Sequence, residues 1–484
     1  MSRYLSTILA ILLLVAPLTA QAERYELGRR LRYFEDAWEQ CKDEKLRTEA
    51  ATYMNTAVMS FFSFKLNEAG RALDQGYLVL TKAGERTQRT KMLSLWIKPS
   101  TRWLDLSAMQ LPKIKVEHFY DLKADKLASI EFLYAWRHLS GLTVTNSFQE
   151  FGTLQLPGER EIGVLSEAGD YLFHCRWKSK GLDSDHNHFV LSLSKDRDKR
   201  LAALQAKVNE WKTPYANADE VTVALNIKVL QRLANGEILE TDYPADRLLG
   251  ECEAVVKAIE AKSSYYSSAR PGQYWIGVRT ASKGTVPLRV QTVKVESGKK
   301  VPLVLALHGA GGSENLFFDG YGNGKIAKLA AQRGWMVAAP RSGFSKAGHA
   351  ETIDELLKIY PEIDTKRIFT IGHSMGAGEA LREACTTPGR FAAVAALGGG
   401  GSPRPAKDQV EAFKALPFYV GVGEMDFARG QAETLAKNLK KLVVSQVTYK
   451  QYAGIEHMII VQEALPEVFR FFDEVDRKPL GNKP

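Results

Sequence analysis

The pentapeptide Gly372-His373-Ser374-Met375-Gly376 has the residue types and spacing of a nucleophile held on a tight turn. An apolar run, 367–371, leads into it and a helix-forming run begins at Ala377, which predicts a strand, a sharp turn and a helix. The two glycines are needed because a Cβ atom at either position would collide with the turn. The serine hydroxyl would lie at the carboxyl edge of a parallel sheet, beside the free amides of a helix start. We therefore expect Ser374 to be a nucleophile that generates an oxyanion.

This pattern also arises by chance, so an acid, a base and an oxyanion hole must accompany it. Asp426 has the position of the acid: residues 417–423 form an apolar run typical of a buried strand, and Asp426 follows on the loop at its carboxyl end. The alternative is that Asp426 caps a helix beginning near Gln431, although it lies a few residues early for that role. We expect Asp426 to be the acid, with Glu424 as the alternative carboxylate.

His457 has the position of the base. Residues 449–454 are typical of a last strand, and His457 lies on the loop that leads from them into a terminal helix. From there, one ring nitrogen can reach the serine while the acid holds the other. The chain has nine histidines, so a surface histidine could stand there by accident, but the order Ser, Asp, His favours catalysis. We expect His373, inside the turn, to pack beneath it and away from the site.

A glycine-rich loop has the position of the oxyanion hole. The apolar run 301–307 predicts a strand buried on both faces, and it ends in residues 308–313, His-Gly-Ala-Gly-Gly-Ser. Consecutive glycines let backbone amides turn toward the serine. We expect the amide donors to be Met375 and either Ala310 or Gly311. A phosphate-binding loop is disfavoured because no Gly-Lys-Ser/Thr follows and the spacing differs from a dinucleotide fingerprint.

These motifs together resemble the α/β-hydrolase superfamily, over about Gly272 to Val475. Within it, the chain is most similar to secreted esterases of the polyhydroxybutyrate depolymerase and feruloyl esterase type. It resembles dienelactone hydrolases and prolyl-oligopeptidase-type peptidases more distantly. The resemblance implies Ser374 as nucleophile, His457 as base, Asp426 as acid and the amides of Met375 and Ala310 as oxyanion hole, without a metal or cofactor. It implies no substrate, because binding loops vary freely in this superfamily.

The expected function is hydrolysis of carboxylic esters through an acyl-enzyme, with an acylated carbohydrate, a short-chain ester or a polymer ester as substrate. A serine peptidase of the prolyl-oligopeptidase type is an alternative because further domains precede the hydrolase. Those enzymes usually carry a propeller repeat, and this sequence has no internal repeat. A second alternative is a binding protein with a vestigial hydrolase fold.

The composition is that of an ordinary soluble protein, with 45% hydrophobic and 25% charged residues. The net charge is +9, yet no block of Lys and Arg predicts a nucleic-acid partner. Residues 183–188, Asp-Ser-Asp-His-Asn-His, contain several potential metal ligands. We interpret them as a solvated loop between two strands. The oligomeric state is not predicted.

The first 22 residues have the pattern of a secretory signal peptide. A basic start precedes an apolar stretch, Leu5 to Ala16, and Ala20-Gln21-Ala22 offers small residues for cleavage before Glu23. The apolar stretch is too short for a comfortable membrane span, and no cysteine stands at the cleavage point for a lipid anchor. We expect an exported protein, periplasmic or extracellular, without a stable membrane anchor.

Export permits disulfides, and the chain has four cysteines: Cys41, Cys175, Cys252 and Cys385. Four cysteines allow three pairings, and Cys41 could pair with Cys252 if their helical segments pack together. We expect Cys385, on the helix behind the nucleophile, to be a buried free thiol.

The expected fold is multidomain, with a carboxyl-terminal α/β-hydrolase whose mostly parallel sheet has helices on both faces. Helical periodicity, short β-rich runs and a Ser/Tyr-rich boundary divide the rest into helical and β-sandwich-like regions. The expected division is a signal peptide (1–22), a helical region (23–97), a β-sandwich-like domain (98–195), a helical connector (196–265), the hydrolase domain (266–478) and a tail (479–484).

Overall fold

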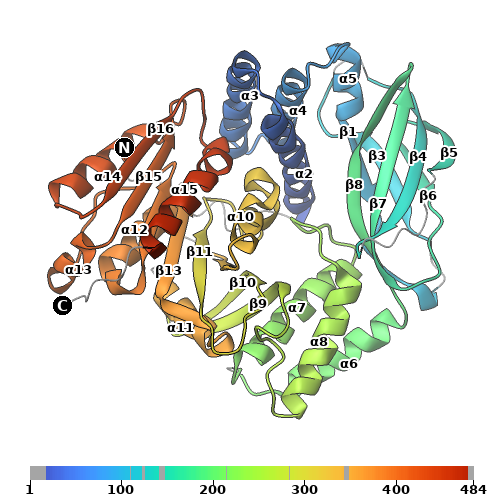
Figure 1. Ribbon diagram of the computed structural model, residues 1–484. Helices are drawn as coiled ribbons and strands as arrows, with labels where there is room; N and C mark the ends of the chain where they lie inside the picture. Colours follow the sequence, from blue (N-terminus) through green and yellow to red (C-terminus); the bar gives the residue numbers. More distant parts are fainter. Residues whose placement is uncertain are drawn as a thin grey trace. The chain divides into compact units, whose positions relative to one another are not determined.

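The strands predicted at residues 301–307, 367–371, 417–423 and 449–454 are present in the computed structural model, where they belong to one eight-stranded sheet (Figure 1). The order across this sheet is β16-β15-β14-β13-β11-β12-β10-β9. The strands are β9 (Gly272–Thr280), β10 (Gly284–Thr292), β11 (Val301–Leu307), β12 (Met336–Pro340), β13 (Ile363–His373), β14 (Ala393–Leu397), β15 (Phe418–Gly423) and β16 (Val447–Tyr452).

The strands from β11 to β16 are parallel, whereas β9 and β10 form an antiparallel hairpin that joins the sheet through β12. Nearly every residue of β11, β12, β14 and β15 is buried. A strand with successive side chains on opposite faces can be buried throughout only if both faces of the sheet are covered. The predicted sheet with helices on both faces is therefore confirmed.

The covering helices lie between successive strands, as parallel pairing requires, except for the last helix, which follows β16. They are α9 (Leu316–Asp319), α10 (Tyr321–Ala331), α11 (His349–Ile359), α12 (Met375–Thr386), α13 (Val410–Lys414), α14 (Arg429–Lys441) and α15 (Ile459–Arg477). Helices α10 and α15 pack against each other, and α12 packs against β13 and β14. The loops that leave β11, β13, β15 and β16 all start at the carboxyl ends of parallel strands, so they lie along one edge of the sheet.

The structure describes residues 18–108, 111–122, 126–140, 148–213, 215–282, 284–342 and 348–477. The chain forms two units, of which the first comprises residues up to 212 with 223–261, and the second comprises 213–222 with everything from 262 onward. The segments 23–97, 98–195 and 196–265 that sequence patterns separate thus belong largely to one unit. Helix α7 (Ala218–Ala234) begins in the second unit and continues in the first.

Two sheets form the β-sandwich-like part of the first unit. A three-stranded sheet has the order β1-β3-β6 and a five-stranded sheet the order β2-β8-β7-β4-β5. The strands are β1 (Leu95–Pro99), β2 (Trp103–Asp105), β3 (Lys113–His118), β4 (Ser129–His138), β5 (Gln149–Gln155), β6 (Gly158–Glu161), β7 (Gly169–Ser179) and β8 (Leu182–Ser194). The first strand begins before the predicted boundary at residue 98.

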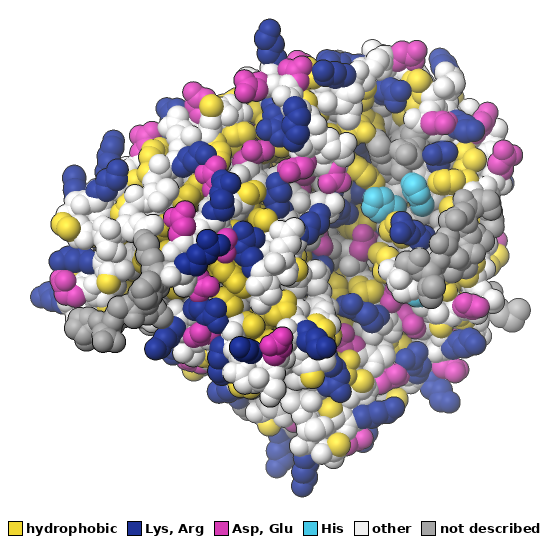
Figure 2. All heavy atoms as spheres, in the orientation of Figure 1, with side chains coloured by type: hydrophobic (Ala, Val, Ile, Leu, Met, Phe, Trp, Pro, Cys, Tyr) yellow, Lys and Arg dark blue, Asp and Glu magenta, His cyan; other side chains and the backbone are white. Residues whose placement is uncertain are grey.

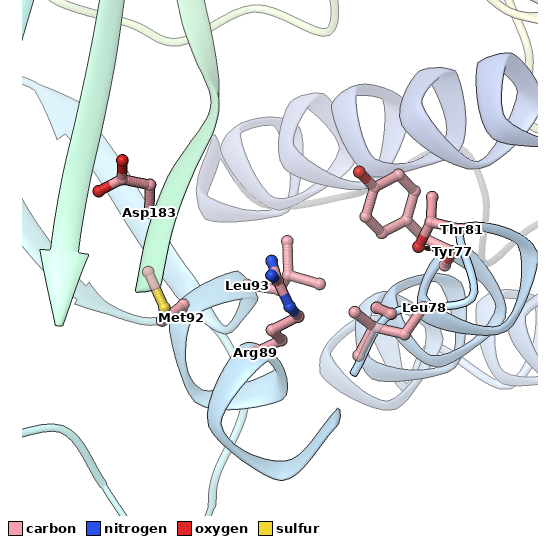
Figure 3. A pocket seen from close by; sticks show the side chains of 8 residues that line it. Tyr77, Leu78, Thr81, Arg89, Met92, Leu93 and Asp183 are labelled. Atoms are coloured by element: carbon pink, nitrogen blue, oxygen red, sulfur yellow. Dashed lines mark hydrogen bonds between the residues drawn. The ribbon is translucent and has the colours of Figure 1, made fainter. Parts of the chain in front are cut away.

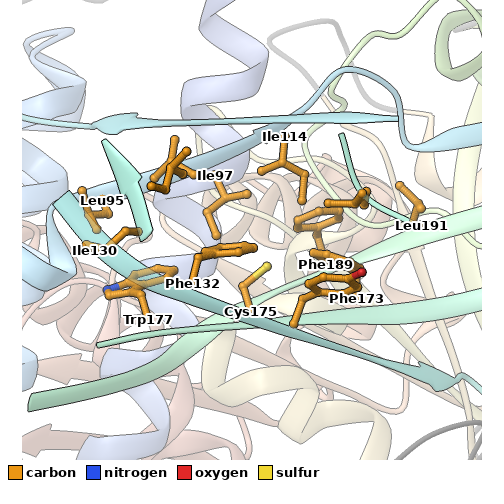
Figure 4. Packing of buried hydrophobic residues seen from close by; sticks show 14 of the residues in the cluster. Leu95, Ile97, Ile114, Ile130, Phe132, Phe173, Cys175, Trp177, Phe189 and Leu191 are labelled. Atoms are coloured by element: carbon orange, nitrogen blue, oxygen red, sulfur yellow. The ribbon is translucent and has the colours of Figure 1, made fainter. Parts of the chain in front are cut away.

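The core of the first unit lies between these two sheets (Figure 4). Ile97 of β1 and Ile114 of β3 face Phe132 of β4 and Phe173 of β7, all of them buried. The alternation of buried and partly exposed residues along β4 and β7 follows from the two-residue repeat of a strand with one face in the core.

Among the residues that the structure describes, six helices complete the first unit together with most of α7. They are α2 (Leu18–Gln40), α3 (Glu44–Phe62), α4 (Leu66–Leu80), α5 (Arg86–Leu93), α6 (Arg197–Glu210) and α8 (Ala245–Glu260). Most of the predicted signal peptide lies outside the described residues, since α2 begins at Leu18. None of the helices in the described part of the chain combines the length and apolar character that crossing a membrane requires.

One prediction for the first unit is wrong, and one possibility that the sequence left open is not realised. Residues 183–188 are part of β8 rather than a solvated loop, because β8 continues its pairing with β7 as far as Leu182. Asn187 is accordingly buried. The suggested disulfide between Cys41 and Cys252 is not formed, since all four cysteines are free and buried. The expected buried thiol at Cys385 is confirmed.

Two further observations concern a predicted strand and the distribution of basic residues. One of the short β-rich runs that predict strands in the first half of the chain, residues 142–145, lies outside the described residues. On the face shown in Figure 2, Lys and Arg side chains are interspersed with Asp and Glu rather than gathered in one block. This distribution agrees with the scatter of basic residues along the chain.

Candidate active site

Ser374 lies at a strained turn between β13 and α12. Its backbone has φ 54° and ψ −115°, a conformation that non-glycine residues rarely adopt. A Cβ atom on Gly372 would stand 2.1 Å from the carbonyl oxygen of Gly376, and one on Gly376 would stand 2.1 Å from the carbonyl oxygen of Leu307. Both glycines are therefore required by close backbone approach. The side chain of Ser374 is only partly buried, as a nucleophile that meets substrate must be.

Asp426 and His457 meet at the same edge of the sheet. His457 Nδ1 lies 2.8 Å from Asp426 Oδ1, and the exposed fractions of the two residues are 2% and 5%. The backbone amide of Ala428 donates to the same carboxylate oxygen at 2.7 Å, which fixes the carboxylate. Because an ionised carboxylate only accepts, His457 carries its proton on Nδ1 and leaves Nε2 as a proton acceptor.

The Nε2 atom of His457 is buried and has no hydrogen-bond partner among the residues that the structure describes. A hydrogen bond to the Ser374 hydroxyl is therefore not formed in this structure. Catalytic hydrogen bonds often tighten only when substrate binds, so the open Nε2 is compatible with a base that is ready to take a proton. An unpaired buried nitrogen costs free energy, and such exceptions are concentrated at functional sites.

The loop after β11 lies beside the nucleophile. A Cβ atom on Gly309 would stand 3.4 Å from the Cβ of Ser374. His308 shapes this loop: it is buried, its Nδ1 lies 2.8 Å from the carbonyl oxygen of Gly309, and its Nε2 accepts from the amide of Ser342 at 3.0 Å. The predicted donor Ala310 follows on this loop and is partly exposed.

The other predicted oxyanion donors are Met375 and Gly311. Met375 is the first residue of α12, so its amide is among those that have no acceptor within the helix. Gly311 has φ 79°, a left-handed conformation that glycine adopts at little cost. Both residues are only partly buried.

His373 is buried, as predicted, but it does not lie away from the site, because its ring contacts both His457 and Tyr321. Its Nε2 lies 2.8 Å from the carbonyl oxygen of His457, and its Nδ1 lies 2.6 Å from the hydroxyl of Tyr321. The first contact requires a proton on Nε2, so Nδ1 accepts from Tyr321. The Tyr321 oxygen in turn accepts from the amide of Gly309 at 3.4 Å. Burial, followed by the neighbouring His457, lowers the pKa of His373 well below its usual value, so the ring is neutral.

Substitution of Tyr321 by phenylalanine should destabilise the protein by about 1–3 kcal/mol, because it leaves a buried acceptor on His373 and the Gly309 amide unsatisfied. Denaturant unfolding of the variant measures this loss. Tyr449→Phe is the control, since its hydroxyl makes only a 3.5 Å contact with Gln451 at the surface. Equal stability of the Tyr321 variant and the wild type would contradict the role of this hydroxyl.

Glu424, the alternative acid, lies away from the imidazole. Its side chain is exposed and accepts a hydrogen bond from the amide of Gly454 at 2.9 Å. The carboxylate in contact with His457 is that of Asp426.

Glu456 is a buried carboxyl group that sequence analysis did not single out. It has no exposed surface and accepts hydrogen bonds from the amides of Met458 and Ile459, where α15 begins. Burial raises the pKa of Glu456 to about 7, although these amides and the nearby His457 oppose the shift. The only local signal for it was a Glu shortly before an apolar helix, a pattern that resembles a helix cap.

Glu456 should make the protein less stable as the pH rises from about 4.5 to 7. Over this range the unfolded chain releases the proton that the folded protein keeps, so the free energy of unfolding falls by up to about 3 kcal/mol. Glu456→Gln keeps an oxygen for the two amides but removes the titration, so this part of the pH dependence should vanish. Denaturant unfolding at pH 4.5, 6 and 7.5 measures it. Glu424→Gln is the control, and an unchanged slope in Glu456→Gln would contradict the assignment.

Phe427 was also missed by sequence analysis. Its ring centroid lies 4.1 Å from that of the His457 imidazole, and the two planes are inclined by 35°. The side chain of Phe427 is nevertheless 56% exposed. A single phenylalanine after the acid gives no signal in a sequence, because its significance depends on where His457 lies in space.

The first unit has an open cavity of about 190 Å³, lined by residues of α4, α5 and β8 (Figure 3). Arg89 reaches into this region from α5, and Leu78, Met92 and Leu93 contribute apolar surface. Its lining contains no histidine, cysteine or serine. The lining of this cavity therefore offers no serine and histidine pair of the kind predicted at Ser374 and His457.

The sheet order and the loops that carry Ser374, Asp426 and His457 define the second unit as an α/β-hydrolase domain, as the sequence predicts. In agreement, residues 344–474 match the model of a family described as phospholipase/carboxylesterase. The matched segment contains all three residues and supports the classification of this unit as a serine ester hydrolase. No protein of curated function matches the chain in sequence.

Several solved structures are similar to parts of this chain. A ferulic acid esterase is 16% identical over 43% of this chain and 99% of its own, with a TM-score of 0.37. A thermostable esterase is 14% identical over 79% of this chain and 99% of its own, also with a TM-score of 0.37. A feruloyl esterase module from Clostridium thermocellum, complexed with sinapinate, is 16% identical over 42% of this chain and 88% of its own, with a TM-score of 0.35. At these values the likeness gives no information on substrate.

Proposed function

We propose that Ser374, His457 and Asp426 form a catalytic triad that hydrolyses carboxylic esters. The observation that carries this proposal is the buried hydrogen bond between His457 and Asp426, next to a strained serine turn. This bond fixes the imidazole in the tautomer whose free nitrogen can accept the serine proton. The glycine-rich loop and the start of α12 supply backbone amides beside the serine.

In the first half of the reaction, Ser374 Oγ attacks the ester carbonyl while its proton moves to His457 Nε2. Asp426 stabilises the imidazolium that forms. The carbonyl oxygen becomes an oxyanion that accepts hydrogen bonds from the amides of Met375 and of Ala310 or Gly311. Collapse of this intermediate breaks the bond to the alcohol, and His457 returns the proton to the leaving oxygen.

In the second half, water attacks the acyl-serine. His457 takes a proton from this water, the same amides hold the second oxyanion, and the proton then passes to Ser374 Oγ. The products are the free carboxylic acid and the regenerated serine, so no oxidant or cofactor is needed.

The substrate class follows from the surroundings of the serine. The connection from β14 to β15 contains only short helical segments, so no large lid is inserted at this point. An open site suits an acylated carbohydrate, a short-chain ester or the end of a polymer ester.

Covalent labelling and paired substrates test the proposal. A fluorophosphonate probe should label Ser374, identified by peptide mass spectrometry, and 4-nitrophenyl acetate should be hydrolysed. Peptide anilides should be cleaved slowly or not at all. Absence of labelling and of ester turnover would favour a binding protein with an inactive fold, and preferential anilide cleavage would favour a peptidase.

We also propose export through the signal peptide of residues 1–22, on the basis of its basic start, apolar stretch and small residues before Glu23. Expression in a bacterial host, followed by fractionation and amino-terminal sequencing, tests this. The exported protein should begin at Glu23. Intact protein that begins at Met1 and remains in the cytoplasm would contradict the proposal.

A further inference from the structure

Two aromatic rings contact the imidazole of His457, and they differ in exposure. The ring of His373 lies 4.7 Å from it, centroid to centroid, and is fully buried. The ring of Phe427 lies 4.1 Å from it and is 56% exposed. Phe427 is therefore the ring that lies between the imidazole and the surrounding solvent.

The position of Phe427 is fixed by the residues on either side. The amide of Ala428 donates to the Asp426 carboxylate at 2.7 Å, and the amide of Arg429 donates to the Asp426 carbonyl at 3.0 Å. Asp426 and Ala428 are both buried. Phe427 thus lies on a tight turn that holds its ring over the imidazole. More than half of this apolar side chain is exposed, so burial in a core does not explain its position.

The mechanism of ester cleavage determines which part of the substrate would contact the Phe427 ring. His457 Nε2 returns the proton to the leaving oxygen, so the alcohol portion must lie beside the imidazole. The carbonyl oxygen instead points at the amides of Met375 and the glycine-rich loop. A side chain packed on His457 is therefore a neighbour of the alcohol and not of the oxyanion.

We propose that Phe427 forms a subsite for the leaving alcohol, and that it favours alcohols whose ring presents a flat C–H face, such as a pyranose. An exposed aromatic face packs on a flat ring through dispersion and burial of apolar surface, which a short acyclic alcohol cannot match. This inference rests on the proposed ester hydrolysis. It assigns the alcohol side of the substrate and leaves the acyl group open.

The competing role for Phe427 is to hold the imidazole in place without touching substrate. That role predicts the same fall in kcat/KM for every ester when the ring is removed. A subsite instead predicts a loss that depends on the alcohol. A series of esters with one acyl group and different alcohols separates the two, because all of them form the same acetyl-enzyme.

The experiment compares ethyl acetate, cyclohexyl acetate and an O-acetylated methyl glycoside as substrates of the full-length protein. Phe427→Ala should lower kcat/KM for the two cyclic esters about 10-fold relative to ethyl acetate, as expected for the loss of roughly 60 Å² of apolar contact. Phe427→Tyr keeps the aromatic face and should stay within about threefold of the wild type. Val443→Ala, which removes another exposed apolar side chain, should change neither ratio.

Acyl transfer provides a second readout. With 4-nitrophenyl acetate as donor, Phe427→Ala should reduce acetyl transfer to cyclohexanol relative to transfer to ethanol. An equal loss for all esters and acceptors would overturn the subsite and leave an orienting role. If the wild type neither hydrolyses any acetate nor reacts with a fluorophosphonate, the proposed function itself fails, so the two failures are distinguishable.

Discussion

Replacement of Ser374 by alanine is expected to lower kcat/KM for 4-nitrophenyl acetate by about 10⁴-fold or more and to abolish labelling by a fluorophosphonate. Without the hydroxyl there is no acyl-enzyme, and only the amides and binding contacts remain to assist attack by water. The strained backbone at this position is set by Gly372 and Gly376, which the substitution leaves in place. Steady-state kinetics together with a thermal unfolding curve measures both activity and fold.

Ser402 provides the matched control for this substitution. It is an exposed serine on the loop after β14. Its hydroxyl accepts one long hydrogen bond, of 3.4 Å, from the side-chain amide of Asn438. Ser402→Ala should keep full activity and full labelling. Turnover by Ser374→Ala at the wild-type rate, with an unchanged unfolding curve, would overturn the assignment of the nucleophile.

Asp426→Asn is expected to lower kcat by about 10³ to 10⁴-fold while the protein remains folded. Oδ1 of Asp426 accepts from both the Ala428 amide and His457 Nδ1. An asparagine that keeps its oxygen at this position lacks the charge that stabilises the imidazolium. An asparagine that turns its NH₂ group to this position presents a donor to Nδ1 instead. That contact requires Nδ1 to accept, which moves the imidazole proton to Nε2 and removes the base. The kcat measured at saturating ester isolates this effect from substrate binding.

Glu424→Gln is the control for the acid, because this exposed carboxylate lies two residues away and bonds only the Gly454 amide. It should leave kcat unchanged within a factor of about two. A large loss in Glu424→Gln together with a small loss in Asp426→Asn would reverse the choice between the two carboxylates.

The hydrolase domain could be predicted from sequence because its strands β11 and β15, which precede the glycine-rich loop and Asp426, are continuous apolar runs. Residues 301–307 and 417–423 have no polar interruption, as strands covered on both faces require. The residue types that do chemistry follow directly at the ends of these runs. Strand position and site position are therefore encoded together.

The first unit was less predictable because its strands are short or polar. Strand β6, Gly-Glu-Arg-Glu, is almost entirely exposed and has no apolar pattern. Residues 183–188 have the composition of a loop, and only their pairing with β7 makes them a strand. Tertiary pairing overrides local propensity in both places.

The residues that sequence analysis missed at the site share one property. Tyr321 lies far from His373 in the chain, and Phe427 gains its significance only from the place of His457. The cysteines illustrate the same limit: Cys41, just after α2, and Cys252, on α8, are both buried, but a disulfide requires a specific separation and direction of two Cβ atoms. Contacts between residues that lie far apart in the chain produce no periodic pattern or motif in a single sequence.

The hydrolase unit includes a short stretch, 213–222, that precedes its main segment in the chain. Within this stretch, the buried Thr222 hydroxyl accepts from the amide of Gly277 on β9 at 2.9 Å, and the Asp219 carboxylate accepts from the amide of Tyr265. A fragment that starts at residue 262 would lose both partners. Gene fusion or recombination with a breakpoint near residue 262 would therefore separate the hydrolase unit from both of these hydrogen-bond partners.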